Sequence, residues 1–457
     1  MNMRYLLAVL TGLACFVALR PSPAQTAHPA VTFNGQIASI VYRNCSACHR
    51  PGEAAPFSLL SYRDVATHGT LIAAATSARI MPPWRAEPAS YAYRDERRLS
   101  DSDIALIRDW VGQGMPEGPG KAPDPPQFPS GWRLGEPDLV VEMPAAYHLK
   151  ADGPDVYRNI AVPLGLGEDK WITAIEMRPS ARAAVHHVLY FADPNGRVHL
   201  KESEGAEPGF SGMRAGGATL PLGGWAVGAQ PHFFPEGLAL RLPQGSDLVI
   251  QYHFHPTGKP ETEKSVIGLY FAKEPPSRTL IAIQLPPVYS LFSGLDIPAG
   301  GKDFVIRDSY TLPVDIDAAG VGAHAHYLAT KMKLTATLPG GETKTLLAIN
   351  DWNFNWQDQY YFRDMVALPR GTRLDAEIHW NNSADNPNNP SSPPVRVTWG
   401  EQSKDEMGTV FLQGVPHDEA DLQLLRNDMG KHQNQIMSER MKMDPEFPKK
   451  LAALLAQ

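Results

Sequence analysis

Residues 182–190, RAAVHHVLY, place two adjacent histidines inside an apolar, β-prone run. Neighbouring side chains of a regular strand point to opposite faces. His186 and His187 therefore cannot share one metal ion unless the backbone bends there or the two rings use different nitrogens. The structural alternative is a strand end with one buried and one solvated imidazole. The dipeptide alone does not decide, and a metal site would need ligands from elsewhere in the chain.

Length and composition limit the class of protein. With 457 residues the chain is long for one domain, and two or three are expected. A formal net charge of -7 with mixed signs provides no basic stripe, which argues against nucleic-acid binding. The 42 prolines favour loops and edge strands over long helices.

An export signal is predicted at residues 1–24. Arg4 precedes an apolar run that is short for a membrane span, and small residues follow at a plausible cleavage site. A lipoprotein site at Cys15 is disfavoured, because Gly12 is a poor residue three positions before it and the apolar run continues beyond it. We expect an exported, periplasmic protein.

The segment Cys45-Ser46-Ala47-Cys48-His49 has the C-x-x-C-H pattern of covalent c-type haem attachment. Two thiols form thioethers to the haem, and the following imidazole becomes an iron ligand. A redox disulfide or half a zinc site are the alternatives. Haem is favoured because the histidine follows at once, export is predicted, and the remaining cysteine lies in the signal.

A sixth iron ligand is expected downstream of this motif. Met81 is the first candidate, because the two prolines after it fix an extended loop that can present the sulfur; His68 and Met115 are the alternatives. Residues 25–117 resemble a small class I cytochrome c. A methionine ligand there would suit electron transfer, not oxygen activation at the haem.

The remaining chain is predicted to be rich in β-structure. A Pro/Gly linker at 118–131 is followed by short alternating or apolar runs separated by turns. The fold class is therefore a multidomain, mainly β protein: a small α-helical cytochrome c domain, then two antiparallel, jelly-roll-like β-sandwiches. The expected sandwiches span 132–275 and 276–416, and a helical tail spans 417–457. Examples of the predicted strands are the runs at 138–142, 188–191, 247–252 and 333–338.

Two further histidine clusters occur in this region. His253 and His255 end an apolar run, and His324 and His326 repeat the H-x-H spacing, which places both rings on one face of a strand. A single H-x-H is weak evidence. Three clusters among 15 histidines favour metal binding.

The order of these motifs resembles the type II copper, ascorbate-dependent monooxygenases, the family of dopamine β-monooxygenase and the peptidylglycine α-hydroxylating enzyme. The resemblance covers roughly Trp132 to Pro416. It is carried by the histidine pair and by the segments 224–229, 234–237, 248–256, 322–331 and 405–408. It implies two copper domains.

The resemblance also implies the ligands. His186, His187 and His253 correspond to the first copper site, and the second site, where oxygen binds and catalysis occurs, corresponds to His324, His326 and Met407. Three imidazoles suit a copper that changes oxidation state, whereas two imidazoles and a thioether favour Cu(I) and its reaction with oxygen. By the same resemblance, His255 is not a direct ligand, and Gln251 lies beside His253 between the coppers.

Some positions depart from the family. Gly322 stands where the peptide-hydroxylating enzyme has an arginine, and Thr409 and Phe411 stand where it has asparagine and tyrosine. A clamp for a peptide carboxylate is therefore missing, and peptide amidation is not expected. Animal members are rich in disulfides, for which this chain has no cysteines to spare.

Together these features predict a copper-dependent monooxygenase that hydroxylates a C–H bond of a small organic substrate with O2. Its cofactors would be two copper ions and one c-type haem, with electrons passing from haem to the first copper and then to the second. The external donor would be a reduced redox protein, a quinol pathway or an ascorbate-like reductant. The alternatives are a periplasmic electron-transfer or copper-binding protein without monooxygenase activity, and a zinc or other structural metal site.

Overall fold

The computed structural model describes residues 30–53, 55–128, 131–202, 207–212, 220–226 and 229–455. The predicted export signal, with Cys15, lies outside these ranges. Strands make up 34% of the structure and helices 19%, so the protein is mainly β, with several antiparallel sheets, as the sequence predicts. Among the described helices, none combines the length and apolar character needed to cross a membrane.

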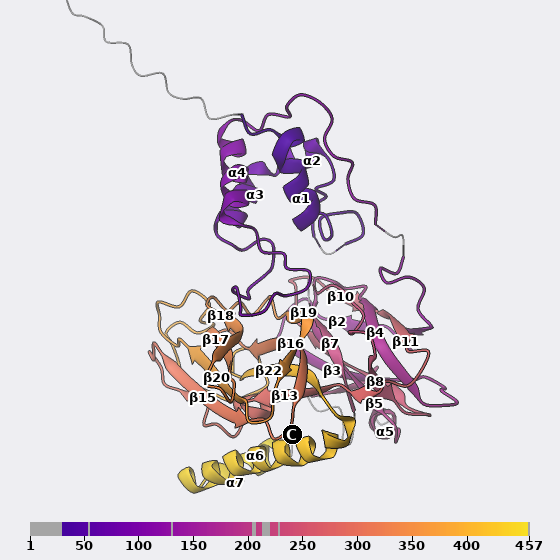
Figure 1. Ribbon diagram of the computed structural model, residues 1–457, viewed down its shortest axis with the longest axis vertical. Coiled ribbons are helices and arrows are strands. Elements are labelled where there is room, and N and C mark those ends of the chain that lie inside the picture. The colour runs from indigo at the N-terminus through magenta and orange to yellow at the C-terminus, as the bar shows by residue number, and fades with distance from the viewer. Residues whose placement is uncertain are drawn as a thin grey trace, which may run out of the picture.

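Figure 1 shows the N-terminal part as a group of helices. These helices pack around an apolar cluster of their own. Its elements are η1 (Phe33–Ile37), α1 (Ala38–Asn44), α2 (Tyr62–Thr67), α3 (Gly69–Ser77) and α4 (Asp101–Gly112). Phe33, Ile107 and Trp110 are almost fully buried there. Ser100 caps α4 by accepting a hydrogen bond of 3.1 Å from the Asp103 N–H, a donor that the first helical turn leaves unpaired.

The first β-sandwich consists of two facing sheets that share one apolar core. The described strands have the orders β1-β11-β4-β8-β12 and β6-β3-β9-β5-β7, antiparallel except for the short pair β8–β12. In chain order, with the ribbon β2–β10 and one helix, the elements are β1 (Leu139–Glu142), β2 (Tyr147–Leu149), β3 (Val156–Pro163), β4 (Lys170–Arg178), β5 (Val185–Asp193), α5 (Arg197–Glu202), β6 (Phe210–Ser211), β7 (Leu220–Ala226), β8 (Leu238–Leu242), β9 (Asp247–Phe254), β10 (Glu261–Glu263), β11 (Val266–Phe271) and β12 (Arg278–Thr279).

Strand β9 is central in its sheet and buried along its whole length. Leu248, Ile250, Tyr252 and Phe254 point into the sandwich core. Because successive side chains of a strand alternate between faces, His253 points to the opposite face. That face is the one turned away from the first core.

The second sandwich begins with β13, directly after β12, and its sheets have the orders β13-β22-β16-β19 and β15-β20-β17-β18. Its large core unites apolar residues from both sheets. In chain order, with the ribbon β14–β21, the elements are β13 (Ile281–Leu285), η2 (Pro287–Ser290), β14 (Asp296–Ile297), β15 (Phe304–Thr311), β16 (Ile316–Ala325), β17 (Ala329–Thr337), β18 (Thr343–Ile349), β19 (Gln359–Leu368), β20 (Arg373–Trp380), β21 (Val397–Thr398) and β22 (Gly408–Pro416).

A segment of the N-terminal part, residues 84–98, leaves the helices and packs on the second sandwich; we call it the strap. Glu87 N–H donates to the carbonyl of Ala348 in β18 at 2.8 Å, and Arg94 N–H donates to Tyr361 in β19 at 2.7 Å. Strands β18 and β19 are edge strands of the two sheets. The strap therefore satisfies backbone groups that these edges would otherwise expose.

The strap also contributes to the core of the second sandwich. Trp84, Ala86 and Tyr93 are buried members of that core. Tyr93 stacks on Phe362 at a ring-centroid distance of 5.8 Å, and its hydroxyl donates to the Leu346 carbonyl at 2.6 Å. The helical part and the second sandwich are thus joined by shared packing.

The C-terminal tail is helical, with η3 (Glu419–Asp421), α6 (Leu422–Met443) and α7 (Phe447–Leu455). Figure 1 shows α6 and α7 lying across the second sandwich, at the end remote from α1 to α4. Leu425 is fully buried and Met429 packs against the same core, whereas most of α6 is exposed.

Candidate metal centres

A β-bulge brings the adjacent histidines of β5 onto one face of the sheet. The register of β5 against β9 shifts between Val185 and His187, so His186 is the extra residue of the bulge. Val185 and Val188 both point into the sandwich core. His186 and His187 are consequently left together on the outer face, where His253, the partner of His187 in β9, also lies.

The Nδ1 atoms of these three histidines converge. His187 Nδ1 lies 3.2 Å from His186 Nδ1 and 3.4 Å from His253 Nδ1. Nitrogen ligands about 2.0–2.1 Å from a tetrahedral metal ion lie about 3.3 Å from one another. The spacing therefore fits a single ion, and the three side chains form a group that could hold one.

Protonation of this cluster is disfavoured. Burial lowers the pKa of His186 to about 3, and the neighbouring His253 contributes to the shift. The same two causes hold the pKa of His187 well below its ordinary value. Neutral imidazoles keep a lone pair for a metal, so the cluster is ready to bind one at neutral pH.

Asp155, in the loop before β3, supports the cluster from behind. Its Oδ2 lies 3.1 Å from Nε2 of His253, the ring nitrogen on the side away from the other histidines. It also accepts hydrogen bonds from Nδ1 of His255, at 2.8 Å, and from the Ser403 hydroxyl. Burial by itself would raise the pKa of Asp155, but the hydrogen bonds with His253, Ser403 and His255 hold it well below its ordinary value. No sequence motif marks this residue.

His255 and Gln251, two positions on either side of His253, have hydrogen-bond partners of their own. His255 is more than half exposed, at 55% of its side chain, and is bonded to Asp155. Gln251 is buried in β9 on the same face as His253, and it donates a hydrogen bond of 2.8 Å to the Asn159 side chain.

The second histidine pair lies at the end of β16. The rings of His324 and His326 have centroids 5.4 Å apart. His324 Nδ1–H donates to Gln357 Oε1 at 2.5 Å, and His326 Nδ1–H donates to the Asp405 carbonyl at 3.1 Å. The Gln357 amide is itself oriented by donating to the Phe354 carbonyl at 3.0 Å. Because these acceptors engage both Nδ1 protons, each Nε2 presents its lone pair to a metal.

Met407 is buried beside this pair. In the β16–β22 ladder Gly408 lies opposite Ala325, which brings Met407 level with His326. The register thus places the Met407 backbone beside the segment that carries the two histidines.

Glu406 ties these two segments together. It is fully buried and accepts hydrogen bonds from the backbone N–H groups of His326 at 3.1 Å and Leu328 at 2.5 Å. The Trp380 indole at 3.0 Å and the Met407 N–H at 3.2 Å also donate to it. Burial raises the pKa of Glu406 to about 8, although the four donors oppose that shift.

The two histidine sets face each other across the boundary between the sandwiches. The ring centroids of His187 and His324 are 6.0 Å apart. Phe354 lies between the sets, 4.3 Å from the His186 ring and 5.9 Å from the His326 ring. The Phe354 ring, which has no metal-binding atom, thus lies between His186 and His326.

A strained turn borders the second pair. Val288, Tyr289 and Ser290 have φ values of 51°, 52° and 68°, a left-handed conformation that costs side-chain-bearing residues about 1–3 kcal/mol each. The Tyr289 ring lies 5.2 Å from the His324 ring, and the Ser290 hydroxyl donates to the Gly408 carbonyl at 2.5 Å. Such strain is characteristic of functional sites. No sequence motif marks Tyr289 or Gln357 as a neighbour of His324.

Two of the departures from the family pattern prove to be structural partners. Gly322 and Phe411 lie opposite each other in β16 and β22. A Cβ atom at position 322 would collide with the Phe411 ring. The Phe411 ring fits because residue 322 is a glycine. It fills the space that a side chain at position 322 would need.

The C-x-x-C-H segment forms a turn directly after α1. Cys45 and Cys48 are free thiols, and burial raises the pKa of the Cys45 thiol to about 12. His49 Nδ1 lies 3.2 Å from the carbonyl oxygen of Phe57. Donation to this carbonyl would fix the ring and leave Nε2 for an iron, so the donor set fits a covalent haem.

The three candidates for the sixth ligand have different surroundings. The His68 ring stacks on Phe57 at 3.9 Å, on the ring that also contacts His49 at 4.8 Å. Met81 follows α3 and precedes the strap, partly buried. Met115 packs against Gly69, where its sulfur leaves no room for a Cβ atom.

Comparison with solved structures gives weak likenesses. The major capsid protein P2 of bacteriophage PM2 has a TM-score of 0.27 at 13% identity, over 61% of this chain and 97% of that chain. PNGF-II has a TM-score of 0.26 at 9% identity, over 61% and 66%. Likenesses at this level carry no conclusion. No family model matches the sequence.

Sequence comparison is more informative. The chain is 24% identical over 209 residues to DBH-like monooxygenase protein 1 of Gallus gallus. The match covers 42% of this chain and 32% of that protein, so the chain spans about a third of the relative's length. This similarity supports a distant relationship between the chain and the DBH-like monooxygenases.

Proposed function

We propose that this protein is a copper-dependent monooxygenase that hydroxylates a C–H bond of a small organic substrate with O2. The observation that carries the proposal is the convergence of the Nδ1 atoms of His186, His187 and His253 at 3.2–3.4 Å, facing a second imidazole pair. The similarity to a DBH-like monooxygenase points to the same chemistry.

Each set of residues has a distinct role in the proposal. His186, His187 and His253 hold one copper through Nδ1, and His324 and His326 hold the other through Nε2. Met407 adds its thioether to the second set. When bound, the coppers supply one-electron redox chemistry and the reaction with oxygen.

The protein's own residues prepare these sites. Asp155, Gln357 and the Asp405 carbonyl fix the imidazole rings in the orientation that directs a free nitrogen to the metal. Burial keeps the rings neutral. The Tyr289 ring lies beside His324, and Phe411 lies opposite Gly322, two residues before His324 in β16. Such aromatic side chains suit an uncharged or aromatic substrate group better than a carboxylate.

A c-type haem on Cys45, Cys48 and His49 completes the proposal. Hydroxylation consumes two electrons, and a haem attached to the same chain would deliver them one at a time. An external one-electron carrier, such as a reduced redox protein or an ascorbate-like reductant, would reload it. Export to the periplasm, where such donors meet the protein, is part of the proposal.

The test uses the full chain loaded with haem and copper. Product formation and O2 uptake are measured with ascorbate as reductant and a panel of phenethylamine-like and other aromatic compounds. We expect hydroxylation, and its loss in Met407→Leu with haem content and first-site copper unchanged. Met441→Leu is the matched control, because Met441 is exposed on α6.

Other outcomes separate the rival functions. Turnover retained in Met407→Leu would refute the assignment of the second site. Two bound coppers without product on any compound would favour an electron-transfer or copper-binding protein. Stoichiometric zinc in the protein as isolated would favour a structural metal site.

A further inference from the structure

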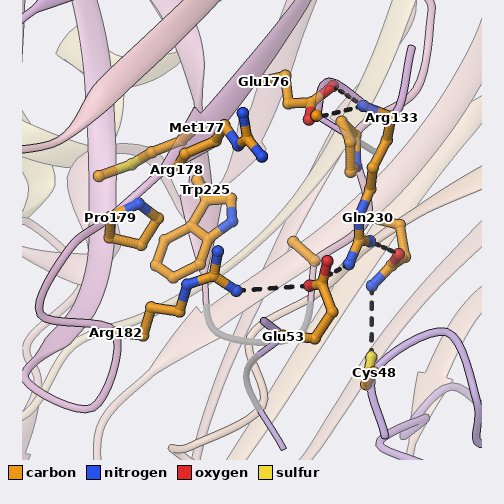
Figure 2. Close-up of a pocket in the computed structure, with 13 residues that line it drawn as sticks. Cys48, Glu53, Arg133, Glu176, Met177, Arg178, Pro179, Arg182, Trp225 and Gln230 are labelled. Carbon is orange, nitrogen blue, oxygen red and sulfur yellow. Dashed lines mark hydrogen bonds and ion pairs between the residues drawn. The ribbon is translucent and has the colours of Figure 1, made fainter. Parts of the chain in front are cut away.

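The haem-attachment turn makes a direct contact with the first sandwich. Gln230 Nε2 lies 3.5 Å from Cys48 Sγ, and Arg133 Nη1 donates to Gln230 Oε1. Figure 2 shows Gln230 between Arg133 and Cys48, with its amide nitrogen toward the sulfur. The arginine fixes the amide oxygen and thereby aims the nitrogen at the cysteine.

From Gln230 a short connection leads to the first histidine cluster. The adjacent residue, Ala229, donates its N–H to the Ala226 carbonyl at 3.0 Å. Ala226 lies directly opposite His187 in the β5–β7 ladder. One side-chain contact, one hydrogen bond and one strand pairing therefore connect Cys48 with a residue of the Nδ1 cluster.

Ion pairs hold the turn and the sandwich together at this place. Glu53, from the haem-attachment segment, pairs with Arg133 and lies 3.5 Å from Arg182, both from the first sandwich, and 2.8 Å from Arg50. Figure 2 shows Glu53 between Arg182 and Arg133. The Glu53 side chain is 17% exposed and that of Arg133 20%, so solvent screens this pair less than a surface pair.

The ion pairs lie close to the strands that carry the first histidine cluster. Arg182 lies four residues before His186, and Trp225, beside Ala226, lines the same small cavity of about 70 Å³ as Cys48 and Glu53. The cavity and the ion pairs thus lie between the haem-attachment turn and the strands that carry the first cluster.

We propose that electrons pass from the haem to the first copper through the contact of Cys48 with Gln230, and that Glu53, Arg133 and Arg182 hold this contact in place; these five residues are here called the junction. The proposal rests on the proposed function, because it requires both cofactors. Each step moves one electron and no atom: ferrous haem becomes ferric, and cupric ion becomes cuprous. Electron transfer is fastest through short covalent and hydrogen-bonded connections, which the path from Cys48 through Gln230 and Ala226 to His187 offers.

The test follows electron transfer without turnover. In the full chain with haem and Cu(II), without oxygen or substrate, a photoexcited flavin reduces the haem and its absorbance reports reoxidation. We expect Gln230→Leu to slow reoxidation at least tenfold, with haem content, copper content and haem midpoint potential unchanged. Glu53→Gln should slow it as well, and Glu53→Asp should restore part of the rate.

Matched controls define the result. Gln423→Leu and Glu168→Gln, at exposed positions, should keep the parent rate. Direct reduction of copper by ascorbate should be the same in Gln230→Leu and the parent. A reoxidation rate within twofold of the parent in Gln230→Leu would overturn the junction, even if ascorbate-driven hydroxylation occurs. Failure of ascorbate-driven hydroxylation in the parent would instead count against the proposed function.

Discussion

Asp155 lies 3.1 Å from His253, on the ring nitrogen opposite the one that joins the histidine cluster. A carboxylate from the loop before β3 therefore supports an imidazole from β9. In metal sites such a partner fixes the ring and increases its strength as a ligand.

Replacement of this carboxylate should weaken the first metal site. We expect Asp155→Asn to lower copper affinity there about 10–100-fold, because such supporting partners have effects of that size. Competition titration with a copper chelator measures the affinity. Asp169→Asn, in a pair with Arg241 on the surface, is the control. Unchanged affinity in Asp155→Asn would exclude the supporting role.

Glu406 should matter for stability irrespective of metal. Four N–H donors meet its two oxygens, and an amide in its place would turn an NH2 group toward at least one of them. We expect Glu406→Gln to reduce the free energy of unfolding by about 1–3 kcal/mol. Urea denaturation of the copper-free protein at pH 9, where the Glu406 carboxylate is ionised, measures it, with the exposed Glu168→Gln as reference. Equal stability of the two variants would contradict this account.

The copper-free protein should lose stability in acid. Burial lowers the pKa of His186 to about 3 and that of His324 to about 4, from ordinary values near 6.5. Between these values the unfolded chain binds more protons than the native chain, so stability falls as the pH falls. The slope is at most about 1.4 kcal/mol per pH unit for each such histidine.

Urea unfolding at pH 7.5, 6.0 and 5.0 tests this dependence. His324→Phe should show a shallower slope, because it removes one of the groups that only the unfolded state protonates. A slope in His324→Phe equal to that of the parent would disprove the pKa shift assigned to His324.

Gly322 and Phe411 should behave as a coupled pair. Gly322→Ala places a methyl group against the Phe411 ring and should cost about 1–3 kcal/mol of stability, as overpacking does. Adding Phe411→Leu should recover part of that loss, which a double-mutant cycle detects. Gly340→Ala is the control, because a Cβ atom there meets open space. Strict additivity of the two changes would refute the coupling.

Part of the architecture could be read from the sequence. The runs at 138–142, 188–191, 247–252 and 333–338 fall on β1, β5, β9 and β17, because alternation and β-branched residues are local signals. The bulge at His186 was also accessible in principle. The apolar residues Val188 and Tyr190 alternate every second position, but Val185 lies three positions before Val188. One extra residue in a strand produces this break in the alternation.

Other parts of the site had no local signal. Asp155 and Gln357 lie in loops. Asp155 is 98 residues from His253, which it contacts, and Gln357 is 33 residues from its partner His324. Their roles arise only when the strands are assembled. The contact of Gln230 with Cys48 is of the same kind, since it joins segments 182 residues apart.

Through the strap, the helical part supplies a portion of the core of the second sandwich. Trp84 and Tyr93 belong to the chain between α3 and α4, yet they complete the core beside Tyr360 and Phe362. A second sandwich expressed without the helical part would expose this aromatic surface and the β18 and β19 edges. Simple end-to-end fusion of two ready-made genes does not yield such an arrangement. An exchange of the helical part for that of another protein therefore requires a strap that matches the surface of the second sandwich beneath it.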